Sequence, residues 1–147
     1  MNTSRLGLAL MHLLAKLPLP VLRGIGWGVG RLLFILAAPR RKIALRNLEL
    51  CFPEVPAAQR RAWAKETFVV FCQTFIDRSW LWFGSEALVR SRVQLTGALH
   101  ELEGDTATIV FAPHFYSMDA GGLALPLNTP REFTSIFATN PDPALDA

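Results

Sequence analysis

The sequence predicts an α/β fold, in which an N-terminal hydrophobic helical anchor precedes the first part of a mixed or parallel sheet flanked by helices. Three observations support this prediction. The first 48 of the 147 residues are rich in apolar side chains and contain eight basic but no acidic ones. Residues 107–112 form an unbroken apolar run rich in β-branched residues, which is typical of a strand buried on both faces. A helical pattern and a second strand-like run, residues 133–139, complete one strand–helix–strand unit.

Charge is distributed unevenly along the chain. Hydrophobic residues make up 51% of it and charged residues only 18%, whereas a soluble domain averages about 25% charged residues. Residues 49–147 hold seven basic and all twelve acidic side chains, a net charge of −5. A basic apolar head on an acidic body indicates an N-terminus that seeks an anionic lipid surface. We therefore expect a membrane anchor over residues 1–39 and an α/β domain over residues 40–147.

Two apolar segments make up the predicted anchor. Residues 6–17 are short, and Pro18 and Pro20 then interrupt any helix. Residues 21–38 form the second segment, which as a helix would extend about 27 Å, slightly less than the ~30 Å hydrocarbon core of a bilayer. Two arginines interrupt this segment. A marginal transmembrane span and an interfacial helix or short hairpin therefore both remain open.

Four alternating glycines lie inside the second apolar segment. They contain two GxxxG spacings, Gly24 with Gly28 and Gly26 with Gly30, which allow two helices to approach closely in lipid. A flexible, loosely helical segment is the alternative. The pattern is not a dinucleotide-binding loop, because the GxGxxG spacing fails at Val29 and no strand precedes it.

A cleaved signal peptide is the alternative to a permanent anchor. Against it, no good A-x-A cleavage site follows the first apolar segment. Three basic residues, Arg40, Arg41 and Lys42, come directly after the second segment, where positive charge favours retention on the cytoplasmic side. We therefore expect an uncleaved anchor that faces the cytoplasm.

The remaining elements follow in order along the chain. Residues 40–55 mix apolar and charged side chains. Residues 57–83 predict one long helix that ends at Gly84. Its apolar side chains near helical spacing are Ala64, Phe68, Phe71, Phe75, Ile76 and Leu81. The later elements are a short connection or helix over 85–92, an exposed strand over 93–96, a short helix over 98–103, a turn at 104–105 and a helix over 118–125.

The two cysteines, Cys51 and Cys72, form neither a CxxC motif nor a metal-ligand spacing. Both lie among apolar residues, so we expect two reduced thiols in the core. A disulfide between them is the alternative.

A histidine and an acid follow the apolar run that ends at Ala112. His114 comes two residues after the run, and Asp119 comes five residues later. On one helix that spacing would place the second side chain about 140° from the first, so the two cannot share a helix face. They can meet if His114 lies on the turn and Asp119 in the first helical turn. The carboxylate would then accept the Nδ1 proton and leave the other imidazole nitrogen as a base.

Less specific interpretations of these residues remain open. An ordinary loop histidine and a helix N-terminal acid favoured by the helix dipole would produce the same pattern. Ser117 lies between the pair but lacks a G-x-S-x-G elbow, so we interpret it as a helix N-cap rather than a nucleophile. A histidine base without a positioned nucleophile suits direct attack of an acceptor hydroxyl on an activated carbonyl.

A motif and its flanking segments resemble one known group of enzymes. HFYSMD, residues 114–119, matches the HX4D/E box of glycerolipid-type, lysophospholipid-acyltransferase-like enzymes. RRKIALRNLELCFPE precedes a long aromatic helix, TIVFAPHFYSMDAGGLAL surrounds the box, and FATNPDPALD follows it. In this order they resemble the bacterial lipid A biosynthesis acyltransferases, the lauroyl and myristoyl enzymes of the inner membrane.

The resemblance implies a specific chemistry. It makes His114 the catalytic base and Asp119 its partner in moving a fatty acyl group from acyl carrier protein onto a hydroxyl of a lipid A precursor. It implies no metal and no organic cofactor, and a location on the cytoplasmic face of the bacterial inner membrane. Membrane lipid is then a further partner, and nucleic acid is not. Basic residues beside the membrane would meet lipid phosphates or the acidic carrier protein, or simply snorkel at the interface; they are Arg40, Arg41, Lys42 and Arg46.

The chain departs from the family pattern in two respects. Many members have Glu at the position of Asp119. The family also runs to about twice this length, with an arginine-bearing box and further strands after NPDPALD. We therefore expect an N-terminal half that is inactive alone. The competing hypotheses are a non-catalytic membrane-anchored protein with an incidental His/Asp pair, and a hydrolase in which water replaces the lipid hydroxyl.

Overall fold

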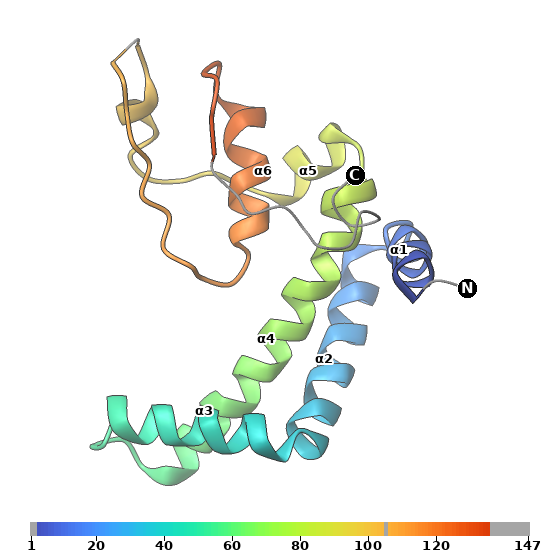
Figure 1. The fold of residues 1–147 in the computed structure, drawn as a ribbon, viewed down its shortest axis with the longest axis vertical. Helices are drawn as coiled ribbons and strands as arrows, with labels where there is room; N and C mark the ends of the chain where they lie inside the picture. The colour runs from blue at the N-terminus through green and yellow to red at the C-terminus, as the bar shows by residue number, and fades with distance from the viewer. Residues whose placement is uncertain (1–2, 105, 136–147) are drawn as a thin grey trace. The chain divides into compact units, whose positions relative to one another are not determined.

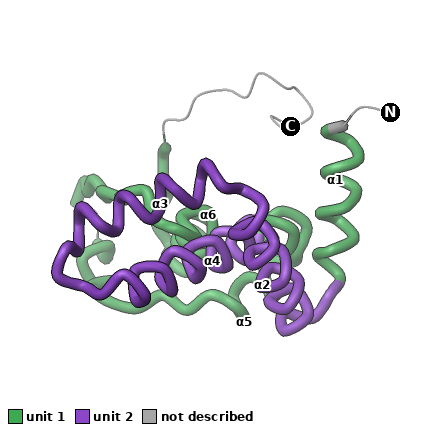
Figure 2. The backbone as a smooth tube through the Cα atoms, turned by 90° about the horizontal axis from the view of Figure 1, so that it is seen from below, with its two compact units in different colours: residues 1–16, 78–147 green, residues 17–77 purple. Residues whose placement is uncertain are grey.

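The computed structural model describes residues 3–104 and 106–135, and these residues form helices joined by extended segments (Figure 1). The chain divides into two compact units: unit 1 consists of Met1–Lys16 with Arg78–Ala147, and unit 2 consists of Leu17–Asp77 (Figure 2). The long helix α4, Ala57–Phe83, contributes residues to both units.

Helix α2, Leu19–Leu36, is the first helix of unit 2. Pro18 is extended and precedes it, so the predicted interruption occurs there. Pro20 instead lies in the first turn of α2, where the missing N–H leaves no helical hydrogen bond unmade. By length and composition α2 is apolar enough to cross a membrane, a test that core helices and signal sequences also pass.

One face of α2 packs closely against α4. A Cβ added to Gly26 would lie 2.6 Å from Gln73 Cγ, and one added to Gly30 would lie 2.5 Å from Val69 Cα. The contacts advance along α2 as they retreat along α4, so the two helices are antiparallel. The buried residues of α2 recur once per turn and form this face: Leu22, Gly26, Gly30 and Phe34.

Polar contacts fix the same pair of helices. Arg23 Nη1 lies 2.9 Å from Oδ2 of the buried Asp77, and Gln73 Nε2 donates a hydrogen bond of 3.0 Å to the Arg23 carbonyl. The GxxxG spacing of Gly24 and Gly28 has a different environment, because a Cβ at either position would meet no atom within 4 Å. Gly26 and Gly30 therefore serve close helix packing within this chain, and the other two glycines do not.

Helix α3, Ala38–Cys51, was not predicted as a helix, and every residue in it is at least partly exposed. Its stability depends on contacts at its ends. Arg41 Nη1 donates hydrogen bonds to the carbonyls of Phe34 and Ile35, which lack partners within the last turn of α2. Arg60 Nη1 similarly binds carbonyls in the turn that follows α3, those of Phe52, Pro53 and Val55.

Helix α4 has the predicted bounds, Ala57–Phe83. The set of its residues that is buried differs in part from the expected one. Ala64, Ile76 and Leu81 are buried, as their spacing predicts. Phe71 and Phe75 are instead 52% and 45% exposed. A helix that is apolar around most of its circumference cannot be oriented by periodicity alone.

Unit 1 contains α1, Thr3–Leu14, the end of α4, α5, Glu86–Arg92, the 3-10 helix η1, Leu99–Leu102, and α6, Met118–Asn128. Gly84 follows the last residue of α4, as predicted, and only glycine fits at this position, because an added Cβ would clash with the Trp80 carbonyl oxygen. Ser85 then caps α5, since its Oγ accepts a hydrogen bond of 3.2 Å from Leu88 N–H. Helices α5 and α6 pack against each other.

The predicted sheet is wrong for the residues that the structure describes. Residues 93–96 and 107–112 are extended but pair with no strand among the described residues, and Ile109 is 97% exposed. The physical reason is that an apolar β-branched run favours an extended backbone, whereas a strand exists only through hydrogen bonds to a neighbour. Residues 133–135 form no strand either, and 136–139 lie outside the described residues.

Both cysteines are free, and their environments differ. Cys72 is buried, as predicted, and this burial raises the pKa of its thiol, so the thiol stays protonated at neutral pH. Cys51 is exposed, which corrects the expectation of a core thiol at that position.

Candidate active site around the HX4D segment

The candidate site is built on a turn in unit 1. The backbone is extended up to Phe115, turns at Tyr116 and Ser117, and enters α6 at Met118. Ser117 occupies the N-cap position, as predicted, but with φ of 63° and ψ of 20° its side chain makes no capping hydrogen bond. A left-handed conformation costs a residue other than glycine roughly 1–2 kcal/mol. The turn between His114 and Asp119 is thus a strained one.

His114 lies on the extended segment just before this turn, and its side chain is exposed. Tyr116 is half-exposed, and the partial burial raises the pKa of its phenol, so the phenol stays protonated at neutral pH. An exposed imidazole before a turn is accessible to a bulky substrate.

Asp119 lies in the first turn of α6, where the helix dipole favours a negative charge. Its Oδ2 forms an ion pair of 2.6 Å with Arg78 Nε of α4, and both side chains are a little more than one third exposed. Pairs at this exposure contribute about 0–1 kcal/mol to stability. Among the described residues no hydrogen bond joins Asp119 to His114, so the structure brings the pair to one turn without linking the two side chains.

Sequence analysis did not identify Arg78. The partners are 41 residues apart, and no local pattern relates them. One signal was available: Asp77 and Arg78 are adjacent charges inside the apolar stretch that ends α4. Charges within an apolar helix are usually paired, and both of these are, Asp77 with Arg23 and Arg78 with Asp119.

An apolar pocket of about 280 Å³ lies beside the ion pair. Two of its lining residues, Leu81 and Gly122, come three residues after Arg78 and Asp119 respectively, which is about one helical turn along α4 and α6. Its lining comes from the end of α4, from α5 and from α6: Leu81, Gly84, Glu86, Val89, Gly122, Leu123, Pro126 and Leu127.

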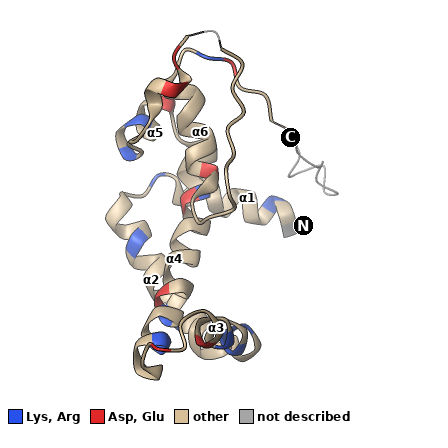
Figure 3. Cartoon of the chain, turned by 90° about the vertical axis from the view of Figure 1, so that its left-hand side faces the viewer, with Lys and Arg blue, Asp and Glu red and all other residues tan. Residues whose placement is uncertain are grey.

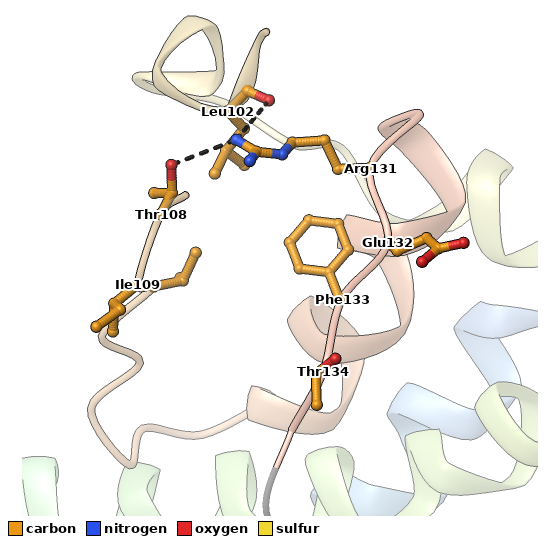
Figure 4. Close-up of a pocket in the computed structure, with 8 residues that line it drawn as sticks. Leu102, Thr108, Ile109, Arg131, Glu132, Phe133 and Thr134 are labelled. Atoms are coloured by element: carbon orange, nitrogen blue, oxygen red, sulfur yellow. Dashed lines mark hydrogen bonds between the residues drawn. The ribbon is translucent and has the colours of Figure 1, made fainter. Parts of the chain in front are cut away.

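A second pocket, of about 260 Å³, lies between the extended segment and the residues after α6 (Figure 4). Arg131 reaches across it, and its Nη1 lies 3.3 Å from Thr108 Oγ1 and 3.5 Å from the Leu102 carbonyl. Its Nη2 donates to the Thr106 carbonyl at 2.5 Å. Arg131, which sequence analysis also missed, therefore holds the extended segment that leads to His114.

The four basic residues predicted to bind lipid or carrier protein all lie on α3, where Lys and Arg are concentrated (Figure 3). They do not share one role. Arg41 binds the end of α2, and Arg46 forms an ion pair of 2.7 Å with Glu49, whose pKa it lowers through its hydrogen bond and charge. Arg40 and Lys42 are exposed, and no hydrogen bond or ion pair involves them within the described part of α3.

The geometry provides an accessible imidazole, a carboxylate at a helix N-terminus and an apolar pocket one turn away. Among the described residues, no group of three or more His, Cys, Asp or Glu side chains could hold a metal ion. Such an arrangement can accept a proton from a nucleophile and accommodate an apolar group.

Comparison with known proteins identifies the family. The family model described as "Bacterial lipid A biosynthesis acyltransferase" matches residues 2–147. The chain belongs to this family. The resemblance noted in the sequence is therefore confirmed for almost the whole chain.

The lipid A biosynthesis acyltransferase family includes curated relatives of known name. The chain is 32% identical over 145 residues to a lipid A biosynthesis acyltransferase of Haemophilus influenzae, covering 96% of this chain and 46% of the relative. It is 26% identical over 144 residues to a lauroyltransferase of Escherichia coli, with the same coverage. It is 30% identical over 132 residues to a palmitoleoyltransferase of that species, covering 87% of this chain and 43% of the relative.

The chain spans about half the length of the curated relatives it matches. No solved structure matches it.

Proposed function

We propose that the protein transfers a fatty acyl group from acyl carrier protein to a hydroxyl of a lipid A precursor. One observation carries the proposal: the family match covers residues 2–147, and within it the HX4D segment lies on an exposed turn at the start of α6. The relatives bear the names of lipid A acyltransferases that differ in the acyl group.

In this proposal His114 acts as general base. It removes the proton of the acceptor hydroxyl while the hydroxyl oxygen attacks the thioester carbonyl of the donor. The carbon–sulfur bond then breaks, and the thiolate of the carrier leaves and takes the proton from the imidazolium, so no covalent acyl-enzyme forms. Asp119 accepts Nδ1–H of His114 and stabilises the imidazolium. Catalytic hydrogen bonds of this kind often tighten only when substrate is bound.

The test is an acyl-transfer assay on the membrane fraction of cells that express the whole gene, because the relatives are about twice as long as the chain. It supplies labelled acyl carrier protein and a lipid A precursor. We expect labelled lipid, whereas the 147-residue chain assayed alone is expected to be inactive. Release of free fatty acid without labelled lipid would favour the hydrolase. If neither labelled lipid nor free fatty acid forms, the result favours the non-catalytic membrane protein.

The apolar pocket of about 280 Å³ supports the choice of an acyl substrate. A Cβ at Gly122 or Gly121 meets no atom within 4 Å, but only Gly122 is among the residues that line this pocket. Gly122→Leu should therefore shift the acyl preference of the protein towards shorter chains, measured by competition between donors of different length. Gly121→Leu, on the same helix, should leave the preference unchanged. If Gly122→Leu and Gly121→Leu show the same acyl-length preference, this pocket does not receive the acyl chain.

We further propose that residues 1–39 attach the protein to the cytoplasmic face of the inner membrane. Helix α2 supports this, because it exposes large apolar side chains, including Trp27 at 51% and Ile35 at 66%, and Arg31 stacks on Trp27 at 4.4 Å. Tryptophan and arginine together are typical of a membrane interface.

The free basic residues of α3 then face lipid phosphates or the carrier protein. Arg40→Ala combined with Lys42→Ala should weaken binding to anionic vesicles about thirtyfold, since each basic residue near such a surface contributes about 1 kcal/mol. Arg46→Ala is the matched control, because Glu49 already neutralises Arg46. Flotation with vesicles of fixed anionic lipid content measures the effect. Equal binding by the double variant and the wild type would contradict a lipid role for Arg40 and Lys42.

A further inference from the structure

We propose that Arg78 is a positioning residue for the candidate His/Asp pair: its guanidinium holds one oxygen of the Asp119 carboxylate and leaves the other for His114. This inference rests on the proposed function and adds to it a residue far from the HX4D segment in the sequence.

The contact itself is specific. Arg78 Nε lies 2.6 Å from Asp119 Oδ2, a short, charge-assisted hydrogen bond between residues 41 positions apart. It joins the last turns of α4 to the first turn of α6 within one compact unit. A link of this kind sets the direction of the carboxylate at the start of the helix.

Arg78 is held in place by its surroundings. Its guanidinium lies 5.9 Å from the ring centroid of Trp82, one turn further along α4. The two residues that follow it, Ser79 and Trp80, are buried, so the backbone that carries Arg78 is packed on its other side. The arginine is therefore a fixed support rather than a mobile surface charge.

The carboxylate can serve both partners. An ionised aspartate has two oxygens and about four acceptor positions. Arg78 uses Oδ2, which leaves Oδ1 for an imidazole N–H. Because so exposed an ion pair adds little to stability, its most direct consequence is the orientation of Asp119. Helices α5 and α6 pack against each other independently of this ion pair.

The experiment measures acyl transfer by the whole-gene protein with Arg78→Met and Arg78→Lys. A misdirected Asp119 should lower kcat about a hundredfold in Arg78→Met, with little change in KM for the acyl donor. Arg78→Lys keeps the charge but not the planar guanidinium, so its kcat should lie between that of the wild type and that of Arg78→Met. Added ethylguanidine should restore part of the activity of Arg78→Met and none of that of His114→Ala.

Two further variants separate positioning from general support. In an Asp119→Asn background, Arg78→Met should cause no further loss of kcat, because Arg78 acts through Asp119. Arg92→Met is the matched control: Arg92 also stacks on a tryptophan, at 5.1 Å from the Trp80 ring, and it should keep kcat within about twofold.

The outcomes that overturn the inference are distinct from failure of the proposed function. Wild-type kcat in Arg78→Met, an equal loss in Arg92→Met, or full additivity with Asp119→Asn would each show that Arg78 does not position the pair. Absence of acyl transfer by the wild-type protein would instead overturn the proposed function, and with it the positioning role of Arg78.

Discussion

Replacing His114 with alanine is expected to abolish acyl transfer. The imidazole is the only group in the HX4D segment that we assign as a base, and removal of a general base typically lowers a rate by about 10²–10⁴-fold. His114 is exposed on an extended segment, so its truncation leaves no cavity and should not unfold the protein. The measurement is the initial rate of lipid acylation in membranes that contain equal amounts of variant and wild-type protein.

His100→Ala is the matched control for this prediction. His100 is likewise exposed and lies in η1, where its nearest charged partner is Glu101 at 3.5 Å. This variant should keep the wild-type rate, and both variants should remain in the membrane fraction because α2 is unchanged. A His114→Ala rate close to that of the wild type would show that another group removes the hydroxyl proton.

The helices of this chain could largely be predicted from local sequence. The long helix ends where Gly84 must approach the Trp80 carbonyl, and this requirement is visible as a glycine after an apolar run. Helix α3 could not be predicted in the same way. Its residues show no apolar face, and it depends on Arg41 and on Arg60, whose contacts lie in the turns at its two ends.

The sheet failed as a prediction for a different reason. The run at 107–112 has the composition of a buried strand, yet Ile109 and Phe111 are 97% and 88% exposed. Composition records what a segment prefers when it has neighbours on both sides. It does not show whether those neighbours exist among the described residues.

The candidate site shows the same limit. His114 and Asp119 were identified because their spacing and the apolar run before them are local features. Arg78 and Arg131 were not, because each acts on a segment more than 20 residues away, Arg78 on α6 and Arg131 on the extended chain at Thr106–Thr108. Long-range polar contacts arise from the packing of helices, and no spacing rule in one sequence records them.

Alanine substitutions at Gly30 and Gly28 are expected to change stability in opposite directions. Each replaces a glycine within α2, so each gains about 1 kcal/mol of helix propensity. At Gly28 the added Cβ meets open space, and the variant should be more stable than the wild type. At Gly30 the Cβ would lie 2.5 Å from Val69 Cα and 2.8 Å from the Phe68 carbonyl oxygen. These are backbone atoms of α4, which cannot move aside without separating the helices.

Overpacking of this kind typically costs 1–3 kcal/mol, about 3 where backbone is struck, so Gly30→Ala should be less stable than the wild type by about 2 kcal/mol. Thermal unfolding of the detergent-solubilised chain, followed by circular dichroism, measures both variants. A shift of Tm in the same direction for the two would mean that α2 does not pack on α4 through Gly30. Opposite shifts would assign the two interleaved GxxxG spacings to different faces: Gly26 and Gly30 to α4, and Gly24 and Gly28 to the surroundings of the protein.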